Sequence, residues 1–439
     1  MQHLPAMPIL VPLLTGALVL LVERRGIVAQ RLMAWTSMAA MLVIAALLLV
    51  EADRGPLLVY LLGDWPARLG IALMVDRVNA LMVLTTTLLA VAALLFACAG
   101  WDRRALHFHA LFQLQLAGLN GAFLTGDLFN LFVFFEVMLI ASYGLLLSGG
   151  RGLRMRAGLH YVVFNIMAST LFLVALGLLY GMTGTLNMAE MALRVANAPA
   201  QDLVLLRAAA GILLVVFCAK AALLPLYLWL PETYSRAPAA VVALFTVMTK
   251  VGVYAVLRVY SLVFSQDSSA AHDGWAWDWL LPAGIVTLVL ASLGALAGRT
   301  LRGSVTYLVI ASGATLFVAF ALQTPAAIAA GLYYLVHSTF VTAALFLVVD
   351  LIRRQRGATA DQLEQAGPLG GATLLGILFL IAAVSVAGLP PLSGFIGKLA
   401  LLAAVPPERV ALVWATVLGT SLMVLIAMSR MGSQVFWRA

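Results

Sequence analysis

Apolar stretches separated by short polar segments run along the whole chain and dominate its pattern. Each stretch is long enough to cross a hydrocarbon core of about 30 Å as a helix. None shows the period-two alternation of a membrane-spanning strand, and a segment in lipid must satisfy its own backbone hydrogen bonds, so the pattern predicts α-helices. We count thirteen predicted spans, which cover residues 5–22, 32–50, 71–97, 105–124, 128–147, 159–181, 204–231, 237–260, 279–298, 304–322, 325–349, 371–404 and 411–429.

The composition strengthens this prediction. Of the 439 residues, 64% are hydrophobic and only 10% are charged, and the mean hydropathy of +1.06 lies outside the range of soluble globular proteins. The predicted fold is therefore all-α and integral to a membrane. Cys98 directly follows the third span and Cys218 falls within the seventh, which argues against a disulfide framework and against a CxxC metal site. We find neither a P-loop nor a dinucleotide-binding glycine motif, so we expect no bound nucleotide and no cofactor.

Charged residues between the spans predict how the chain is oriented. Arg24 and Arg25 follow the first span instead of preceding it, so this span is not a cleavable signal and should remain as a helix. By the positive-inside rule the N-terminus lies outside and the C-terminus in the cytoplasm. The net charge of +8 then belongs to the cytoplasmic side, and nothing further supports nucleic-acid binding. The basic residues that follow odd-numbered spans are Arg24, Arg25, Arg31, Arg103, Arg104, Arg151, Arg154, Arg156, Arg299, Arg302, Arg353, Arg354, Arg356, Arg430 and Arg438. The intervening acidic residues are Glu51, Asp53, Asp64, Glu190, Asp202, Asp267, Asp273 and Asp278.

The lysines are distributed differently from the arginines. All three, Lys220, Lys250 and Lys398, lie inside hydrophobic spans. Arginine does not lose its proton in a protein, whereas a lysine in a poorly hydrated environment can. The sequence thus favours arginine for orientation and lysine for handling protons. An alternative is that the use of arginine reflects genome base composition and that a buried lysine is a structural tie to a carboxylate.

Two further ionisable residues lie near the middle of predicted spans. Glu136 is a lone mid-span glutamate, and a charge at that depth costs about 2.5–3.5 kcal/mol on insertion scales, which makes it a candidate functional group. His337 has the side chain best suited to a proton relay near neutral pH, although a histidine satisfied by packing is common. Asp127 and His160 lie close to span ends, where interfacial or helix-end roles are the simpler interpretation. The aromatic residues of the segment FNLFVFF are most simply explained by packing or by lipid contact.

Prolines interrupt two of the spans that carry lysines. Pro225 and Pro231 fall in the seventh span, and Pro390 and Pro391 in the twelfth. A proline removes a backbone donor and breaks a helix, which is tolerated at membrane depth where the backbone lines protein or a wet cavity. Because five spans separate the breaks, they enter the membrane in opposite senses, which indicates two inverted five-helix repeats. The predicted organisation is residues 1–100 (spans one to three), 105–260 (first repeat) and 279–429 (second repeat).

Several segments resemble a known family. These are TGDLFNLFVFFEVMLIASYGLLL, HYVVFNIMASTLFLVALGLLYGMTGTLNMAEMA, KAALLPLYLWLPETYSRAPAAVVALFTVMTKVGVYAVLR and AGLPPLSGFIGKL. They resemble the antiporter-like subunits shared by respiratory complex I, membrane-bound hydrogenases and Mrp-type cation/proton antiporters. Within that group the resemblance is greatest to the D subunit of Mrp (Pha or Mnh) antiporters and is densest over residues 108–400. The segment ETYSRAP lacks the histidine usual in complex I relatives, which favours the Mrp branch.

The resemblance implies a proton relay. Glu136 matches the family's glutamate, Lys220 its ion-pair partner in the broken seventh span, Lys250 the connecting lysine, His337 the central histidine and Lys398 the terminal lysine. It also implies a bacterial inner-membrane protein, surrounded by lipid, that assembles with other Mrp subunits and exchanges sodium or another monovalent cation for protons. The resemblance further implies a cation path that lies largely in another chain. Relatives usually continue with a fourteenth helix after the segment VFWRA, so we expect this copy to be truncated or divergent there.

Three other functions stay open at this point. A proton-pumping subunit of complex I or of a membrane-bound hydrogenase would share every residue named for the relay, and only its partner proteins would distinguish it. A self-sufficient transporter would exchange sodium for protons when expressed alone, and a structural scaffold would tolerate neutral replacement of its lysines. We expect a transporter subunit without catalytic chemistry of its own. As part of an enzyme, it would be a proton-translocating NADH:quinone oxidoreductase subunit.

Overall fold

The computed structural model describes residues 3–55, 57–66, 70–150, 152–265, 274–364, 366–367 and 369–437. Of the residues singled out from the sequence, Arg151, Asp267, Asp273 and Arg438 lie outside the described residues. The chain divides into two compact units, of which the first comprises Met1–Lys220 and Tyr254–Gly274 and the second Ala221–Val253 and Trp275–Ala439. The described residues are mainly helical, as the sequence predicts, and include one two-stranded sheet.

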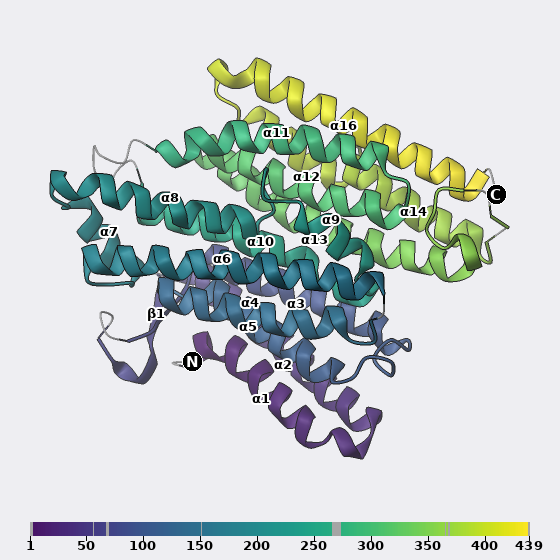
Figure 1. Ribbon diagram of the computed structural model, residues 1–439, viewed down its shortest axis with the longest axis horizontal. Coiled ribbons are helices and arrows are strands. Elements are labelled where there is room, and N and C mark those ends of the chain that lie inside the picture. The colour runs from purple at the N-terminus through teal and green to yellow at the C-terminus, as the bar shows by residue number, and fades with distance from the viewer. Residues whose placement is uncertain are drawn as a thin grey trace. The chain divides into compact units, whose positions relative to one another are not determined.

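The first unit is a bundle of long apolar helices. Its helices are α1 (Met7–Leu21), α2 (Ile27–Arg54), α3 (Arg77–Cys98), α4 (Phe108–Leu124), α5 (Leu128–Leu147), α6 (Leu153–Thr183), α7 (Met188–Ala196), α8 (Leu203–Lys220) and the last part of α10 (Ala239–Leu262), from Tyr254 onward. α4 is buried along almost its whole length and packs against α1 and α5, while α6 runs beside α8 (Figure 1). A Cβ atom at Gly118 would lie 2.6 Å from the backbone nitrogen of Met138, so glycine is what allows α4 and α5 to approach this closely.

Short side chains at the helix ends explain where several of these helices begin. Asp76 caps α3 by accepting hydrogen bonds from the backbone N–H groups of Val78 and Asn79, and the backbone N–H of Asp76 donates to Asn79 Oδ1. Asp127 caps α5 in the same way, through the N–H of Asn130 at 2.8 Å. Before α3, strands β1 (Leu58–Leu61) and β2 (Ala72–Val75) pair antiparallel with Leu58 opposite Val75.

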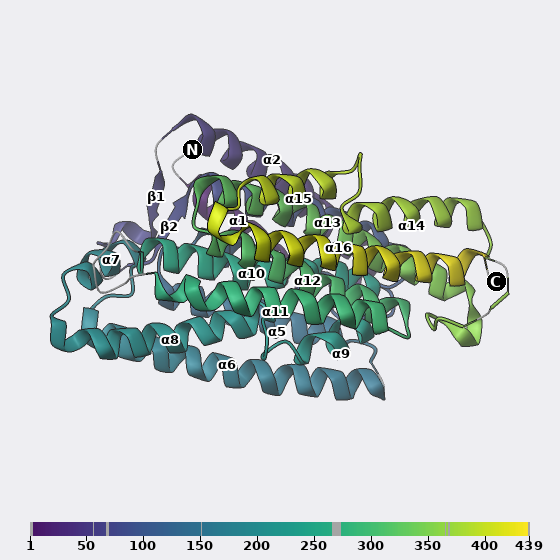
Figure 2. The ribbon, with the colours of Figure 1, turned by 90° about the horizontal axis from the view of Figure 1, so that it is seen from above.

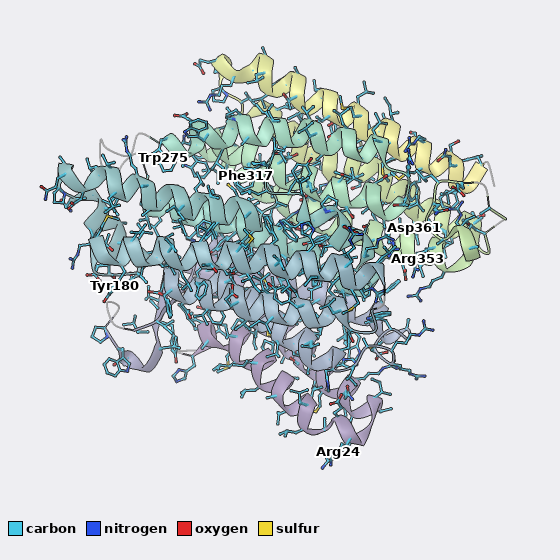
Figure 3. All side chains as sticks on the ribbon, in the orientation of Figure 1. Arg24, Tyr180, Trp275, Phe317, Arg353 and Asp361 are labelled. Carbon is cyan, nitrogen blue, oxygen red and sulfur yellow. The ribbon has the colours of Figure 1, made fainter. Side chains whose placement is uncertain are left out.

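The second unit surrounds α12, a helix that is buried along most of its length. Its helices are α9 (Trp229–Arg236), the first part of α10 (Ala239–Leu262), α11 (Trp275–Ala297), α12 (Leu301–Ala321), α13 (Pro325–Gln355), α14 (Ala372–Ala387), α15 (Ser393–Ala403) and α16 (Val410–Gly432). α12 packs against α9, α11 and α13, and Phe317 on α12 is only 1% exposed (Figure 3). α16 lies alongside both α14 and α15 (Figure 2).

Both spans predicted to be broken are broken in the structure. Along the chain, α8 ends at Lys220, and the segment 221–228 has no helix until α9 begins at Trp229. In the second unit, α14 ends at Ala387, Gly388 follows with a φ of +83°, and α15 begins at Ser393. Gly388 donates a backbone hydrogen bond to Val384, which ends the helix in the left-handed conformation that glycine adopts easily.

The helices extend further than the apolar stretches from which they were predicted. Arg31 lies inside α2, Arg302 inside α12, and Arg353 near the end of α13, although the sequence placed all three between spans. A long arginine side chain can leave the hydrocarbon while its backbone stays helical, so hydropathy underestimates helix length. By length and composition, eleven helices of the described residues could cross a membrane, and α14 and α15 are shorter apolar helices. The count of thirteen spans stays a prediction.

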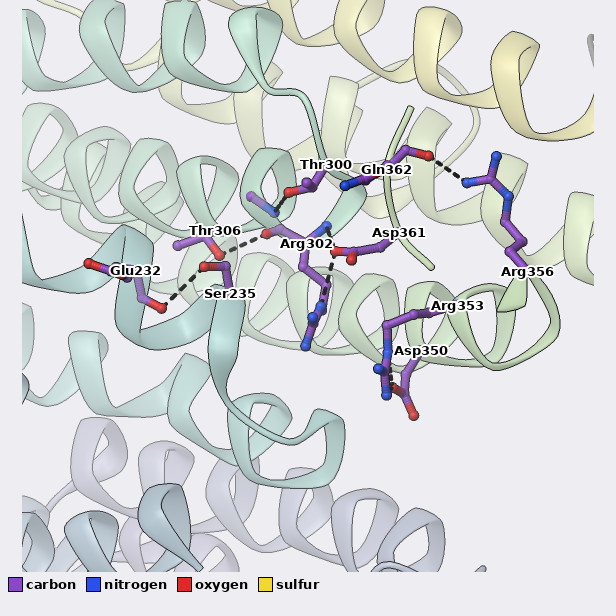
Figure 4. A network of polar contacts seen from close by, with 11 residues as sticks. Glu232, Ser235, Thr300, Arg302, Thr306, Asp350, Arg353, Arg356, Asp361 and Gln362 are labelled. Carbon is purple, nitrogen blue, oxygen red and sulfur yellow. Dashed lines mark hydrogen bonds and ion pairs between the residues drawn. The ribbon is translucent and has the colours of Figure 1, made fainter. Parts of the chain in front are cut away.

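Ion pairs and a short bridge tie the polar end of the second unit together (Figure 4). Asp361 accepts a hydrogen bond from Arg302 at 3.1 Å, and Thr300 pairs with Gln362 in an isolated β-bridge. Arg353 contacts Asp350 at 2.9 Å. Trp275 and Arg353 mark opposite ends of this unit's helices (Figure 3). The pair of Arg302 and Asp361 and the β-bridge therefore fix the segment after α13 to the start of α12.

We expect the ion pair between Asp76 and Arg258 to stabilise the first unit. Burial alone would raise the pKa of Asp76, but Arg258, 2.6 Å away, holds that pKa below its ordinary value of 3.8. Asp76→Asn retains the cap but leaves the Arg258 guanidinium without its anion. Thermal unfolding in detergent at neutral pH should show a loss of about 1–3 kcal/mol in the free energy of unfolding, which is less than for a fully buried ion pair because this pair is partly exposed.

The pH dependence has a definite sign. Because folding lowers the pKa of Asp76, its contribution is present above about pH 4 and disappears as the pH falls through the native value, so the variant and the parent protein should converge in acid. Asp53→Asn is the matched control, since the pair of Asp53 and Arg77 is more than 70% exposed on both sides and should contribute little. Equal stability of the two variants at neutral pH would contradict this assignment.

Candidate functional site

Lys220 is the last residue of α8 and is buried in the first unit, with 5% of its surface exposed. Its ammonium group donates hydrogen bonds to Asn165 Oδ1 at 3.3 Å and to Ser169 Oγ at 3.2 Å, both on α6. A cation at a helix C-terminus also faces carbonyl groups that lack an intrahelical partner. The two acceptors and the helix end together compensate for the loss of water around the charge.

Glu136 lies on α5 and reaches the same serine. The Ser169 hydroxyl donates a hydrogen bond to the Glu136 carboxylate, so Ser169 lies between the carboxylate and the Lys220 ammonium. Among the described residues, no direct ion pair joins Glu136 to a cation. The structure therefore brings the predicted pair together through a hydroxyl group that the sequence analysis did not identify.

A cluster of buried aromatic side chains lies beside Lys220. Phe135, Phe172 and Phe217 are each fully buried, and their rings lie 5.4–6.5 Å apart between centroids. The Lys220 ammonium nitrogen lies 5.9 Å from the centroid of the Phe135 ring, within reach of a cation–π interaction. Phe135 belongs to the segment FNLFVFF, so at least one of its aromatic residues contacts the candidate site as well as the core.

Lys250 lies on the part of α10 that belongs to the second unit and is fully buried. Its ammonium group donates a hydrogen bond to Ser312 Oγ on α12 at 2.5 Å. The Ser312 hydroxyl in turn donates to the backbone carbonyl of Val309 at 2.7 Å. A hydroxyl group from a neighbouring helix is again the acceptor for a buried amine.

His337 is buried on α13, and its Nδ1 lies 2.9 Å from Ser393 Oγ, at the start of α15. Which partner donates depends on the imidazole tautomer. Gly394 follows directly, and a Cβ atom there would lie 2.9 Å from His337 Nε2 and 1.9 Å from the Ser385 carbonyl oxygen. The histidine therefore packs against the break between α14 and α15, where only glycine fits.

Lys398, on α15, borders the same break. Its ammonium group donates to the carbonyl oxygens of Val386 at 3.3 Å and Ala387 at 2.9 Å, the last carbonyls of α14, and to Ser421 Oγ at 2.8 Å. A cavity of about 20 Å³ adjoins this lysine, enough for one water molecule. The polar residues that line this cavity are Ser292, Thr315, Tyr334, Lys398, Thr420 and Ser421.

The structure groups the predicted residues unevenly. Glu136 and Lys220 share one serine in the first unit, and His337 and Lys398 border one helix break in the second. Among the described hydrogen bonds, none links Lys250 to the pair of Glu136 and Lys220 or to the pair of His337 and Lys398. Asp127 caps α5, and burial raises its pKa. His160 is exposed on α6. The sequence analysis did not identify the polar side chains that bind these ionisable groups. The one feature that could have indicated them is a hydroxyl or amide side chain inside an apolar span. These side chains are Asn165, Ser169, Ser312, Ser393 and Ser421.

A second polar cluster in the first unit involves Arg31, Cys98, Asp102 and His109. Potential metal-ligand atoms of Cys98, Asp102 and His109 lie within 4.8 Å of one another. Both carboxylate oxygens of Asp102, however, bind the Arg31 guanidinium, at 2.7 and 2.9 Å. Burial would raise the pKa of Asp102, but Arg31 holds it below its usual range. A metal ion would lie beside this guanidinium, so the arrangement favours a structural ion pair.

Comparison with known sequences gives consistent results. A family model described as NADH:quinone oxidoreductase/Mrp antiporter, TM, matches residues 125–424. The whole chain is 40% identical to the D subunit of a probable K(+)/H(+) antiporter of Rhizobium meliloti (strain 1021), of which it covers 87%. It is 38% identical to the D subunit of the Na(+)/H(+) antiporter of Alkalihalophilus pseudofirmus, again over the whole chain and 87% of that protein.

Solved structures show the same fold. A chain of the Mrp complex from Dietzia sp. DQ12-45-1b superposes with a TM-score of 0.90 at 30% identity, covering 99% of this chain and 80% of that one. A chain of respiratory complex I from Thermus thermophilus superposes with a TM-score of 0.83 at 24% identity, covering 100% of this chain and 89% of that one. The likeness to complex I concerns the fold alone.

We expect Gly394→Ala to disturb the break that holds His337 and Lys398. The added methyl group cannot coexist with the Ser385 carbonyl at 1.9 Å, so α15 must move, at a cost of about 1–3 kcal/mol in the free energy of unfolding. Gly419→Ala on α16 is the control, because no atom lies within 4 Å of its added Cβ and alanine favours a helix. Thermal unfolding in detergent checks both variants, and equal stability would show that the break tolerates a side chain.

Proposed function

The chain belongs to the NADH:quinone oxidoreductase/Mrp antiporter transmembrane family, and from this premise we propose that it is the proton-translocating subunit of a multisubunit monovalent cation/proton antiporter. One observation carries the proposal: every lysine of this membrane protein is buried or half-buried within apolar helices and hydrogen-bonded to a serine hydroxyl. Such groups are costly in a membrane and are typical of ion and proton pathways.

The proposed mechanism uses lysine as a group that can give up its proton. Separation of Glu136 from Lys220 removes the anion that stabilises the ammonium form, and the lysine releases its proton. The proton moves by hydrated steps to Lys250, His337 and Lys398, and renewed association of Glu136 with Lys220 resets the site. The cavity beside Lys398 supports one such hydrated step. A transmembrane potential supplies about 2.3 kcal/mol per charge per 100 mV, which can drive cation export when the two movements are coupled.

The partners follow from the relatives. Proteins similar to this chain are named as D subunits of Na(+)/H(+) or K(+)/H(+) antiporters, and a similar chain occurs in a solved Mrp complex. We therefore propose a hetero-oligomer with other Mrp subunits in the bacterial inner membrane, with sodium or another monovalent cation as the exchanged ion. In this assignment the N-terminus lies outside and the C-terminus in the cytoplasm, as the distribution of arginine between spans indicates.

The proposed organisation retains two inverted repeats, residues 105–260 and 279–429. The breaks between α8 and α9 and between α14 and α15 support it, because each lies beside one of the lysines, Lys220 and Lys398. Unwound backbone beside a buried polar group is typical of inverted-repeat transporters.

A proton-pumping subunit of complex I or of a membrane-bound hydrogenase is the alternative. The fold shared with complex I favours it, whereas the identity of 36–40% to antiporter subunits favours the Mrp assignment. Purification of the native complex distinguishes the two. Co-purification of other Mrp subunits supports the antiporter, and co-purification of iron–sulfur or flavin subunits supports the alternative.

Replacement of Lys220 separates its charge from its ability to lose a proton. Lys220→Arg keeps a cation beside Ser169 and Asn165 but has no accessible neutral form, and Lys220→Ala removes the cation. Sodium/proton exchange in membrane vesicles should fall by about 100-fold or more in both variants, the scale of a lost acid–base group, while both variants still assemble with their partners.

Assembly, measured by co-purification, is the control for both variants. If Lys220 only ties the helices together, arginine should restore the exchange that alanine loses. Wild-type exchange in Lys220→Arg would therefore remove Lys220 from the proton path.

A further inference from the structure

Ser169 differs from the other serines that accept hydrogen bonds from lysine. The hydroxyl groups of Ser312 and Ser421 accept from an ammonium group and donate to a backbone carbonyl of their own helix, Val309 at 2.7 Å and Val417 at 2.7 Å. The Ser169 hydroxyl accepts from Lys220 and donates to the Glu136 carboxylate. Among the described residues, it is the one serine hydroxyl between two ionisable side chains.

We propose that, while Glu136 and Lys220 are associated as in this structure, Ser169 carries the proton between them and hydrogen-bonds to both groups in either charge state. The inference deepens the proposed function, on which it rests, by giving the Glu136–Lys220 pair a route for its proton that needs no water. Asn165 cannot serve in this way, because its carbonyl oxygen accepts from Lys220 but has no proton to pass on.

The proton balance of the step is simple. An N–H bond of the Lys220 ammonium breaks as an O–H bond forms on Ser169 Oγ, and the original O–H bond of Ser169 breaks as one forms on Glu136 Oε1. Lysine and glutamic acid are then both neutral, and serine ends as it began. Both hydrogen bonds of Ser169 are then reversed in direction: its hydroxyl accepts from the carboxylic acid and donates to the neutral amine. Both charged groups can therefore disappear together, without movement of a helix.

The surroundings favour this route. Ser169 is 7% exposed and Lys220 is 5% exposed, and the buried rings of Phe135, Phe172 and Phe217 keep the region apolar. In such surroundings a neutral pair avoids the cost of keeping two charges away from water. The serine side chain has one rotatable bond to its hydroxyl oxygen and is held by α6, so the three groups stay in register.

Three variants test the proposal in the assembled complex. Ser169→Ala removes only the hydroxyl group, Ser169→Thr retains one, and Thr170→Val is the matched control on the same helix. Thr170 is exposed, and its hydroxyl donates to the backbone carbonyl of Ile166 instead of to another side chain. Exchange in proteoliposomes is measured across pH in H₂O and in D₂O, and assembly is checked by co-purification.

We expect Ser169→Ala to assemble, to lose about tenfold or more of the exchange rate, and to change both the pH profile and the solvent isotope effect. Ser169→Thr should recover most of the rate, and Thr170→Val should match the parent protein. A Ser169→Ala complex with the parent rate, pH profile and isotope effect would overturn the proposal. Loss of exchange with an unchanged pH profile and isotope effect would also overturn it, because this result indicates a packing role.

Infrared spectroscopy tests the hydrogen bond without relying on exchange. The carboxylic acid band of Glu136 is identified by its disappearance in Glu136→Gln, and in Ser169→Ala it should move to higher wavenumber because a hydrogen bond is lost. An unmoved band would overturn the proposal even if exchange falls. If the parent complex shows no cation/proton exchange, the proposed function fails, and the position of this band still decides whether Ser169 bonds Glu136.

Discussion

A buried ammonium group needs oxygen acceptors, and much of this structure follows from supplying them inside apolar helices. Placing one charge at mid-membrane costs about 2.5–3.5 kcal/mol on insertion scales, while a hydrogen bond to a charged group contributes about 1.5–3 kcal/mol. Two or three acceptors therefore balance the cost. Lys220 receives two side-chain acceptors and Lys398 receives three acceptors, including two backbone carbonyls.

The helix breaks are one means of supplying these acceptors. An unbroken helix uses its own carbonyl groups, whereas α14 ends at Ala387 and leaves its last carbonyls for Lys398. Serines on neighbouring helices are the other means. A hydroxyl group can accept from an ammonium and donate to a neutral amine, so it suits a lysine whose proton comes and goes better than a carbonyl would. The same chemistry that makes the lysines tolerable in the membrane also leaves them able to titrate.

Local features of the fold could be predicted from the sequence, and features that depend on several helices could not. Pro225, Pro390 and Gly388 act within their own segments, so the two breaks could be predicted from them. The partnership of Ser169 depends on which side of α6 meets α5 and α8, and many apolar spans here contain a serine or threonine with no such role. The proximity of Glu136 to Lys220 was expected only from family resemblance, and the structure adds the hydroxyl group between them. Hydropathy places Arg31 in a loop, but it pairs with Asp102 from within α2.

Proton movement in proteoliposomes that contain the purified complex tests the central claim most directly. A sodium gradient is imposed, and the internal pH is followed for the parent complex and for a complex in which Lys220, Lys250 and Lys398 are all replaced by glutamine. Assembly of both complexes is verified first. Our account predicts that the sodium gradient changes the internal pH of liposomes with the parent complex and leaves that of the assembled triple variant unchanged. Proton movement at the parent rate in the triple variant would contradict it and would make this chain a structural scaffold.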